Sequence, residues 1–221
     1  MRPQALVFGW FGAKTSTLRR YSALYSKLLQ TDRVLTLPTT ILRATTWTGW
    51  KLDRSAAQQY PPGYFEDVRV VHLCSGGVFP FHNVRTVRED LQPHSVVYDS
   101  GPFLPRASHV AHYATKALSV PFSIESAVAK FWTTEGFTMD DAPVVEHLRA
   151  QPLLLLNSEA DDIVPRCGLQ PVLAPKGAPV TMKTWPDSLH AQHYRTYTTE
   201  YEDAVRTFLG RAGLDNSTKQ P

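Results

Sequence analysis

The sequence predicts a doubly wound α/β protein: a mostly parallel sheet of about six strands with helices on both faces. Two observations predict it. Short apolar runs alternate with helical patterns from one end of the chain to the other, which is typical of strands joined by crossover helices. The chain also has 221 residues, enough for one large domain with a substantial core, and it contains no internal repeat.

Six apolar runs have the length and the flanking turn residues of strands. We expect strands over Ala5–Phe8, Arg33–Leu37, Val68–Leu73, Ser95–Tyr98, Leu153–Asn157 and Val180–Thr184.

Two helices follow from apolar residues spaced three and four apart. One is predicted over 18–29, with Thr15, Ser16 and Thr17 available to cap its N-terminus. The other is predicted over 197–209 and is expected to end at Gly210.

The strand rhythm stops between about 105 and 150, where helices are predicted over 124–132 and 144–148. An insertion of this length before a late strand commonly forms a lid or a pocket wall, so we expect a small, mobile lid. Residues 1–213 are expected to form one domain, with 214–221 as a disordered tail.

Composition excludes several classes of protein. Lys and Arg total 23 against 20 Asp and Glu, and the basic residues are scattered, which disfavours a nucleic-acid partner. No apolar run approaches the ~18 residues of a membrane span, so none is expected. Two cysteines, Cys74 and Cys167, are too few for a disulfide scaffold, and we expect a cytoplasmic protein. The oligomeric state stays open.

Residues suited to chemistry follow three of the predicted strands. Cys74-Ser75-Gly76-Gly77 has the form of a nucleophile elbow, in which a strand turns sharply into a helix. Asp161 follows the strand over 153–157, and His190 and His193 precede the last helix. Nucleophile, acid and histidine in this order are typical of the triad of an α/β-hydrolase.

Other interpretations of these residues stay open. Cys74 could be an inert core residue, Asp161 and Asp162 could cap a helical turn, and the two histidines could be structural, His193 more than His190. His72, His190 and His193 match no metal-ligand spacing and the chain has no CxxC, so we expect no metal.

At the first strand end, Phe8-Gly9-Trp10-Phe11-Gly12 lies where an α/β-hydrolase supplies one oxyanion N–H group. This segment lacks the GxGxxG spacing of a dinucleotide site, and we expect no cofactor.

Several collinear motifs resemble the transmembrane-protein-53-like family of α/β-hydrolase-fold proteins, which includes PaxU-type proteins of fungal indole-diterpene clusters. The motifs are Phe8–Gly12, Leu18–Tyr25, the Ser-Gly-Gly elbow, Tyr98–Pro102, Ser158–Asp161 and His190–Arg195. The resemblance covers nearly the whole chain and implies the fold, with Asp161 and His190 as acid and histidine. Because a fold does not fix a reaction, it says less about activity.

The family usually has Phe-Ser-Asn-Gly-Gly at the elbow, and this chain departs from that pattern. An ungapped match through the glycines places the family's serine on Cys74. A match through His72 places it on Ser75 instead, with one residue lost inside the turn. We favour Cys74 because a deletion would disturb the turn, and we expect its thiol to have a lowered pKa beside an imidazole.

The function predicted is that of a small enzyme acting on an apolar ester, lactone or thioester-like metabolite, as in fungal secondary metabolism. Cys74 or Ser75 would be the nucleophile, with His190 as base, Asp161 as orienting acid, and N–H groups near Trp10, Phe11 and Ser75 as oxyanion donors. The substrate-binding residues predicted are Trp47, Trp50, Phe79, Phe81, Asp99 and His193. The alternatives are a cyclase or isomerase that uses histidine and aspartate acid–base chemistry, and a non-catalytic binding protein.

Overall fold

The computed structural model describes residues 1–39, 58–102, 142–164, 172–173 and 177–214. Its core is one parallel sheet in which the strand order is β2-β1-β3-β4-β5-β6, so that the chain starts in the middle and winds outward in both directions. The doubly wound α/β class predicted from the sequence is confirmed.

The six strands lie where the apolar runs predicted them, with ends that differ by three residues at most. They are β1 (Ala5–Phe11), β2 (Val34–Thr39), β3 (Val70–Cys74), β4 (Ser95–Asp99), β5 (Leu153–Ser158) and β6 (Val180–Trp185). Strands β3 and β4 are buried at every position, as expected for central strands covered on both faces.

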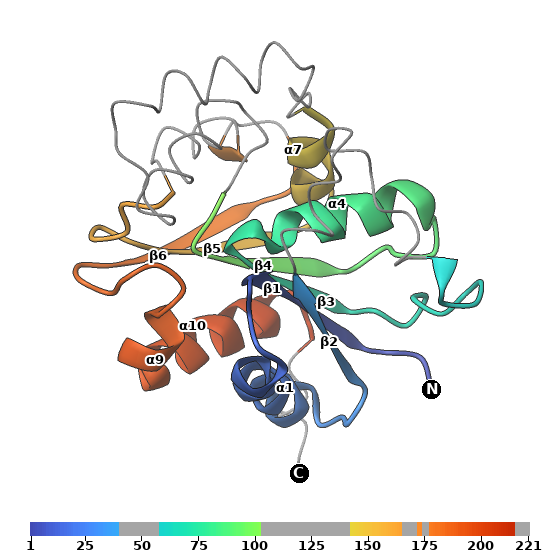
Figure 1. Ribbon diagram of the computed structural model, residues 1–221, viewed down its shortest axis with the longest axis horizontal. Coiled ribbons are helices and arrows are strands. Elements are labelled where there is room, and N and C mark those ends of the chain that lie inside the picture. The colour runs from blue at the N-terminus through green and yellow to red at the C-terminus, as the bar shows by residue number, and fades with distance from the viewer. Residues whose placement is uncertain (40–57, 103–141, 165–171, 174–176, 215–221) are drawn as a thin grey trace.

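Helices cover the two faces of the sheet (Figure 1). One face carries α4 (Val78–Val87) and α7 (Ala142–Arg149), and the other carries α1 (Thr15–Leu29), α9 (His193–Thr196) and α10 (Thr198–Arg211). No helix in the described ranges is long and apolar enough to cross a membrane. The predicted lid falls mostly outside the described residues and stays a prediction. Within that segment the structure describes α7, at the place of the helix predicted over 144–148.

Two local expectations about helix ends are wrong. Thr15, Ser16 and Thr17 do not cap α1; Thr15 begins the helix, and Lys14 is at the N-cap without a side-chain hydrogen bond. Gly210 does not end α10, which continues to Arg211. The helix ends one residue later, before a turn in which Gly213 adopts the left-handed conformation (φ +69°) that glycine takes without steric cost.

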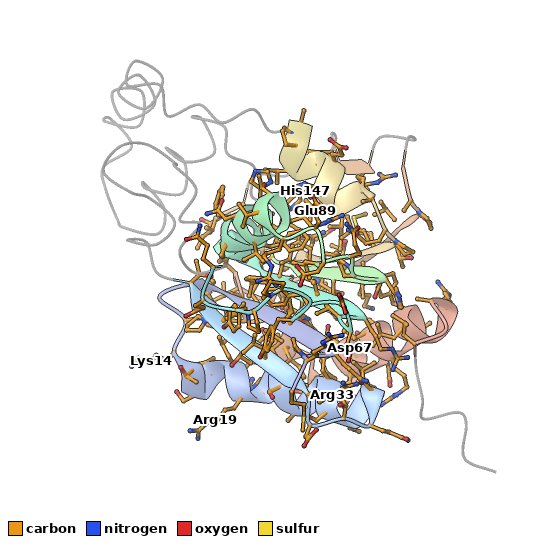
Figure 2. All side chains as sticks on the ribbon, turned by 90° about the vertical axis from the view of Figure 1, so that its right-hand side faces the viewer. Lys14, Arg19, Arg33, Asp67, Glu89 and His147 are labelled. Carbon is orange, nitrogen blue, oxygen red and sulfur yellow. The ribbon has the colours of Figure 1, made fainter. Side chains whose placement is uncertain are left out.

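The alternation of side chains along β3 divides its residues between two cores. Val71 and Leu73 face α4 and α7 in one apolar cluster, whereas Val70, His72 and Cys74 face α1 and α10. A strand has a period of two, so this assignment also fixes where each side chain at the strand end is directed. The exposed Arg19 lies on the outer side of α1, away from these layers, as Figure 2 shows.

Figure 2 also shows Arg33 and Asp67 beside one another, and their charged groups pair at 2.8 Å. This pair is partly exposed, so it adds little to stability.

The turn after β3 is packed tightly against β1. A short 3₁₀ turn, η1 (Ser75–Gly77), leads from β3 into α4. A Cβ atom added at Gly77 would lie 2.5 Å from the carbonyl oxygen of Phe8. Because that oxygen belongs to the backbone of a central strand, neither partner can move away, and only glycine fits at this position.

We therefore expect Gly77→Ala to destabilise the protein by about 1–3 kcal/mol through overpacking. The matched control is Gly210→Ala in α10, where an added Cβ meets nothing within 4 Å. That change should be neutral or stabilise the protein by about 0.5–1 kcal/mol, since alanine has the higher helix propensity. Urea unfolding monitored by circular dichroism measures both, and equal stability of the two variants would contradict the packing argument.

Candidate active site

Ser75 lies at the tip of the turn between β3 and α4, with a backbone conformation that few side chains adopt. Its φ is +49°, in the left-handed region where a non-glycine residue is held only by its surroundings. The hydroxyl of Tyr98, on the neighbouring strand β4, donates a hydrogen bond of 2.9 Å to the Ser75 carbonyl oxygen. This strained turn directs the Ser75 side chain away from both cores, as a nucleophile elbow requires.

The Ser75 hydroxyl lies 2.7 Å from Nε2 of His190. The Nδ1 atom of the same ring lies 2.8 Å and 3.0 Å from the two carboxylate oxygens of Asp161. An ionised carboxylate only accepts hydrogen bonds, so Nδ1–H of His190 donates to Asp161 and Nε2 accepts from Ser75. The three residues predicted at separate strand ends thus converge on one chain of hydrogen bonds.

Asp161 is held as a carboxylate in the loop after β5. Its Oδ1 atom accepts hydrogen bonds from the backbone N–H groups of Ile163 (3.0 Å) and Val164 (3.4 Å). Burial alone raises the pKa of Asp161, but the hydrogen bond and charge of His190, with these two N–H groups, lower that pKa below its ordinary value. Asp162, the alternative acid in the sequence, is exposed.

Cys74 is not at this site, and its assignment as the favoured nucleophile is wrong. As the last residue of β3 it faces α1, where its side chain is 1% exposed. Burial raises the pKa of the Cys74 thiol well above its ordinary value, and the negative charge of Asp99 adds to that rise. The lowered pKa that the sequence predicts for Cys74 is therefore wrong, because the imidazole of His190 faces Ser75.

Several residues predicted to bind substrate have structural roles. Phe79 and Phe81 lie on α4 and pack into the core between that helix and the sheet. Asp99 and His193 are completely buried and bonded to protein groups, so neither reaches a substrate. Trp10 is half-buried at the end of β1, while Trp47, Trp50 and the side chain of Phe11 lie outside the described residues.

Behind Ser75, His190 and Asp161, a buried polar cluster joins the strands to helices α1 and α10. The ligand-type atoms of His72, Cys74 and Asp99 lie within 4.8 Å of one another. Both ring nitrogens of His72 already have partners, the hydroxyls of Tyr25 at 2.7 Å and Tyr201 at 3.2 Å. Burial lowers the pKa of His72 to about 4. These contacts describe a hydrogen-bonded network better than a metal site.

The sequence pattern did not reveal the tyrosines of this network, Tyr21, Tyr25 and Tyr201. Their spacing on the buried faces of α1 and α10 looks like ordinary amphipathic helix. One feature of the sequence could have indicated the network: tyrosines on the apolar faces of helices bury their hydroxyls, and each buried hydroxyl needs a hydrogen-bond partner.

The fold is shared with solved structures that include an esterase and a thioesterase. An esterase of Pyrococcus furiosus superposes with a TM-score of 0.56 at 16% identity over 95% of this chain and 81% of that one. The RedJ thioesterase of the prodiginine pathway in Streptomyces coelicolor gives 0.52 at 13% identity, over 93% and 85% of the two chains. MenH from S. aureus gives 0.55 at 13% identity over 96% of both chains.

These likenesses show an α/β-hydrolase fold. No protein-family model and no curated protein sequence matches the chain. The resemblance to the transmembrane-protein-53-like family stays a prediction.

Because Cys74 is enclosed and its pKa is raised, we expect it to resist alkylation in the folded protein. Iodoacetamide at pH 8, followed by peptide mapping, should leave Cys74 unmodified in buffer and modify it fully in 6 M guanidinium chloride. Rapid native modification of Cys74 would show that the thiol faces solvent and would return it to consideration as the nucleophile.

Proposed function

We propose that this chain is a serine hydrolase that cleaves esters or thioesters, with Ser75 as nucleophile, His190 as general base and Asp161 as the orienting acid. The observation that carries the proposal is the continuous pair of hydrogen bonds, 2.7 Å from Ser75 to His190 and 2.8 Å from His190 to Asp161. A binding protein built on this fold has no need of that geometry.

The chemistry follows from the protonation of these groups. His190 Nε2 takes the proton of Ser75 as Oγ attacks the substrate carbonyl, and Asp161 stabilises the imidazolium that forms. The imidazolium then protonates the leaving alcohol or thiol as the tetrahedral intermediate collapses to an acyl-Ser75. Water, deprotonated by His190, attacks the acyl group, and the acid product leaves as Ser75 regains its proton.

With Ser75 and not Cys74 as the nucleophile, the oxyanion donor that follows the nucleophile moves by one residue. The residue after the nucleophile is then Gly76, whose N–H group stands at the start of the turn into α4. We assign the second donor to the backbone near Trp10 and Phe11, at the end of β1, the strand adjacent to β3.

Small apolar acyl compounds are the proposed substrates, including lactones and thioesters of secondary metabolism. Two of the three structural neighbours described above support this class, since they are an esterase and a pathway thioesterase. A cyclase or isomerase would use His190 with Asp161 or Asp99 and would form no acyl-enzyme. Asp99 is completely buried, and the Ser75 hydroxyl 2.7 Å from His190 favours the covalent route over that alternative.

A fluorophosphonate probe tests the nucleophile directly, because it bonds to an activated serine. Intact-mass spectrometry should show one adduct per chain, mapped to the peptide that contains Ser75. Ser75→Ala should abolish the adduct, whereas Cys74→Ala, one residue away, should keep it. An unlabelled wild-type protein, or an adduct that survives in Ser75→Ala, contradicts the proposal.

Asp161→Asn should lower kcat for p-nitrophenyl butyrate by about 10²–10⁴-fold, since an amide supports neither the tautomer nor the charge of His190. The matched control is Asp162→Asn, at the next and exposed carboxylate, which should stay within about two-fold of wild type. Thermal unfolding should differ little between the two variants. A greater loss of activity in Asp162→Asn would move the acid by one residue.

A further inference from the structure

The carboxylate of Asp99, at the end of β4, is completely buried and is bonded to hydroxyl groups. Its Oδ1 atom accepts a hydrogen bond from Ser100 at 2.8 Å, and its Oδ2 atom accepts from Tyr201 at 2.6 Å and from Tyr21 at 3.3 Å. Buried polar groups need hydrogen-bond partners, and these three hydroxyls supply them. Asp99 is therefore the final acceptor of the buried polar cluster.

Ser100 connects that carboxylate to the loop that carries His190. Its hydroxyl donates its proton to Asp99, so its two remaining positions are those of an acceptor. One is filled by the backbone N–H of Ala191 at 2.8 Å and the other by Nε2 of His193 at 2.9 Å. Every hydrogen-bonding position of this buried hydroxyl is used.

The loop is tied down on both sides of His190. Nδ1 of His193 lies 2.7 Å from the Ser188 hydroxyl, and its ring stacks on Trp185 at the end of β6, with ring centroids 5.6 Å apart. Ala191, directly after His190, has a φ of +55°, which a non-glycine residue keeps only under external constraint. The Ser100 hydroxyl, bonded to the Ala191 N–H, supplies that constraint.

We infer that Ser100, backed by Asp99 and His193, is a positioning residue that sets the backbone of His190 so that its ring stands between Asp161 and Ser75. The inference rests on the proposed function. Ser100 touches neither Ser75 nor a substrate; it acts through the Ala191 N–H group, one peptide bond from His190. A general base must be held close to its productive geometry, and supporting hydrogen bonds supply that precision.

The directions of these hydrogen bonds predict the tautomers of three histidines. His193 must carry its proton on Nε2, since the Ser100 proton is already given to Asp99. His72 must also carry it on Nε2, because the Tyr201 proton goes to Asp99. His190 has the opposite form, with the proton on Nδ1 facing Asp161.

The first part of the test compares the tautomers of the three histidines in the wild-type protein. In protein labelled with ¹⁵N-histidine, long-range ¹H–¹⁵N correlation spectra at pH 7.5 should show His72 and His193 as Nε2–H and His190 as Nδ1–H, with His72→Gln, His190→Gln and His193→Gln as assignment variants. An Nδ1–H form of neutral His193 would overturn the inference, whether or not the chain is an enzyme.

The second part uses Ser100→Ala, which removes the acceptor of the Ala191 N–H. We expect kcat to fall by about 10–100-fold with KM changed less than about three-fold, as for a displaced catalytic group. The His190 signals should move to an average of the two tautomers. Ser100→Gly, which relaxes the backbone at φ +56° without restoring the hydroxyl, should remain as impaired as Ser100→Ala.

The matched control is Ser95→Ala, at the start of β4, the strand that Ser100 follows. Its buried hydroxyl makes no hydrogen bond within the described part of the chain, so its loss should leave kcat and the His190 tautomer unchanged. Combining Ser100→Ala with Asp161→Asn should cost less than the product of the two single effects, because both act through His190.

The outcomes separate the two claims. A wild-type protein that does not react with fluorophosphonate refutes the proposed function, and the tautomers still decide the inference. A wild-type protein that reacts, together with a folded Ser100→Ala or Ser100→Gly variant of unchanged kcat and His190 tautomer, overturns the inference alone.

Discussion

The left-handed turn at Ser75 is the constraint on which the rest of the site depends. Strand β3 places alternate side chains on its two faces until Cys74, and the positive φ of the next residue takes Ser75 out of that alternation. The turn is closed by Gly77, which has no room for a Cβ against the Phe8 carbonyl, and by the Tyr98 hydroxyl on the Ser75 carbonyl. A strained conformation persists when its surroundings determine it from several sides, and here a strand and a side chain do so.

The order of the strands in the sheet also sets how far the loops that carry Asp161 and His190 must extend to reach Ser75. Strand β6, which precedes the His190 loop, lies three positions from β3, a distance of about 14 Å at the usual strand spacing. The loop after β6 must therefore cross the ends of β5 and β4 to bring His190 to Ser75. Asp161 follows β5 and Ser100 follows β4, so both stand on that route, and each bonds to the loop. The support of His190 is a consequence of the topology.

The sequence predicted the fold and the acid–histidine pair. Both predictions depend on the alternation of strands and helices and on the order of the motifs along the chain, and neither changes when a strand end is misplaced by one residue. It did not decide between Cys74 and Ser75, since a slip of one residue reverses which face a side chain occupies. The alternation of side chains along β3 does favour Ser75. Val70, His72 and Cys74 lie two residues apart and so share one face of the strand, and Val70 is a core residue on that face. The positive φ of Ser75 and the contact of Gly77 with β1 join segments distant in sequence, and no local pattern reports them.

The two histidines of the motif at 190–193 illustrate why identical side chains three residues apart take different tasks. His190 lies at the tip of the loop and keeps 12% of its side chain exposed, whereas His193 begins α9 and is completely buried.

A carboxylate such as Asp99 is costly to bury, and the hydroxyls that offset this cost occupy positions on α1 and α10 where apolar side chains would need no partner. Ser100 bonds this buried cluster to the His190 loop. The unfavourable free energy of burying the carboxylate is therefore accompanied by a fixed backbone next to His190.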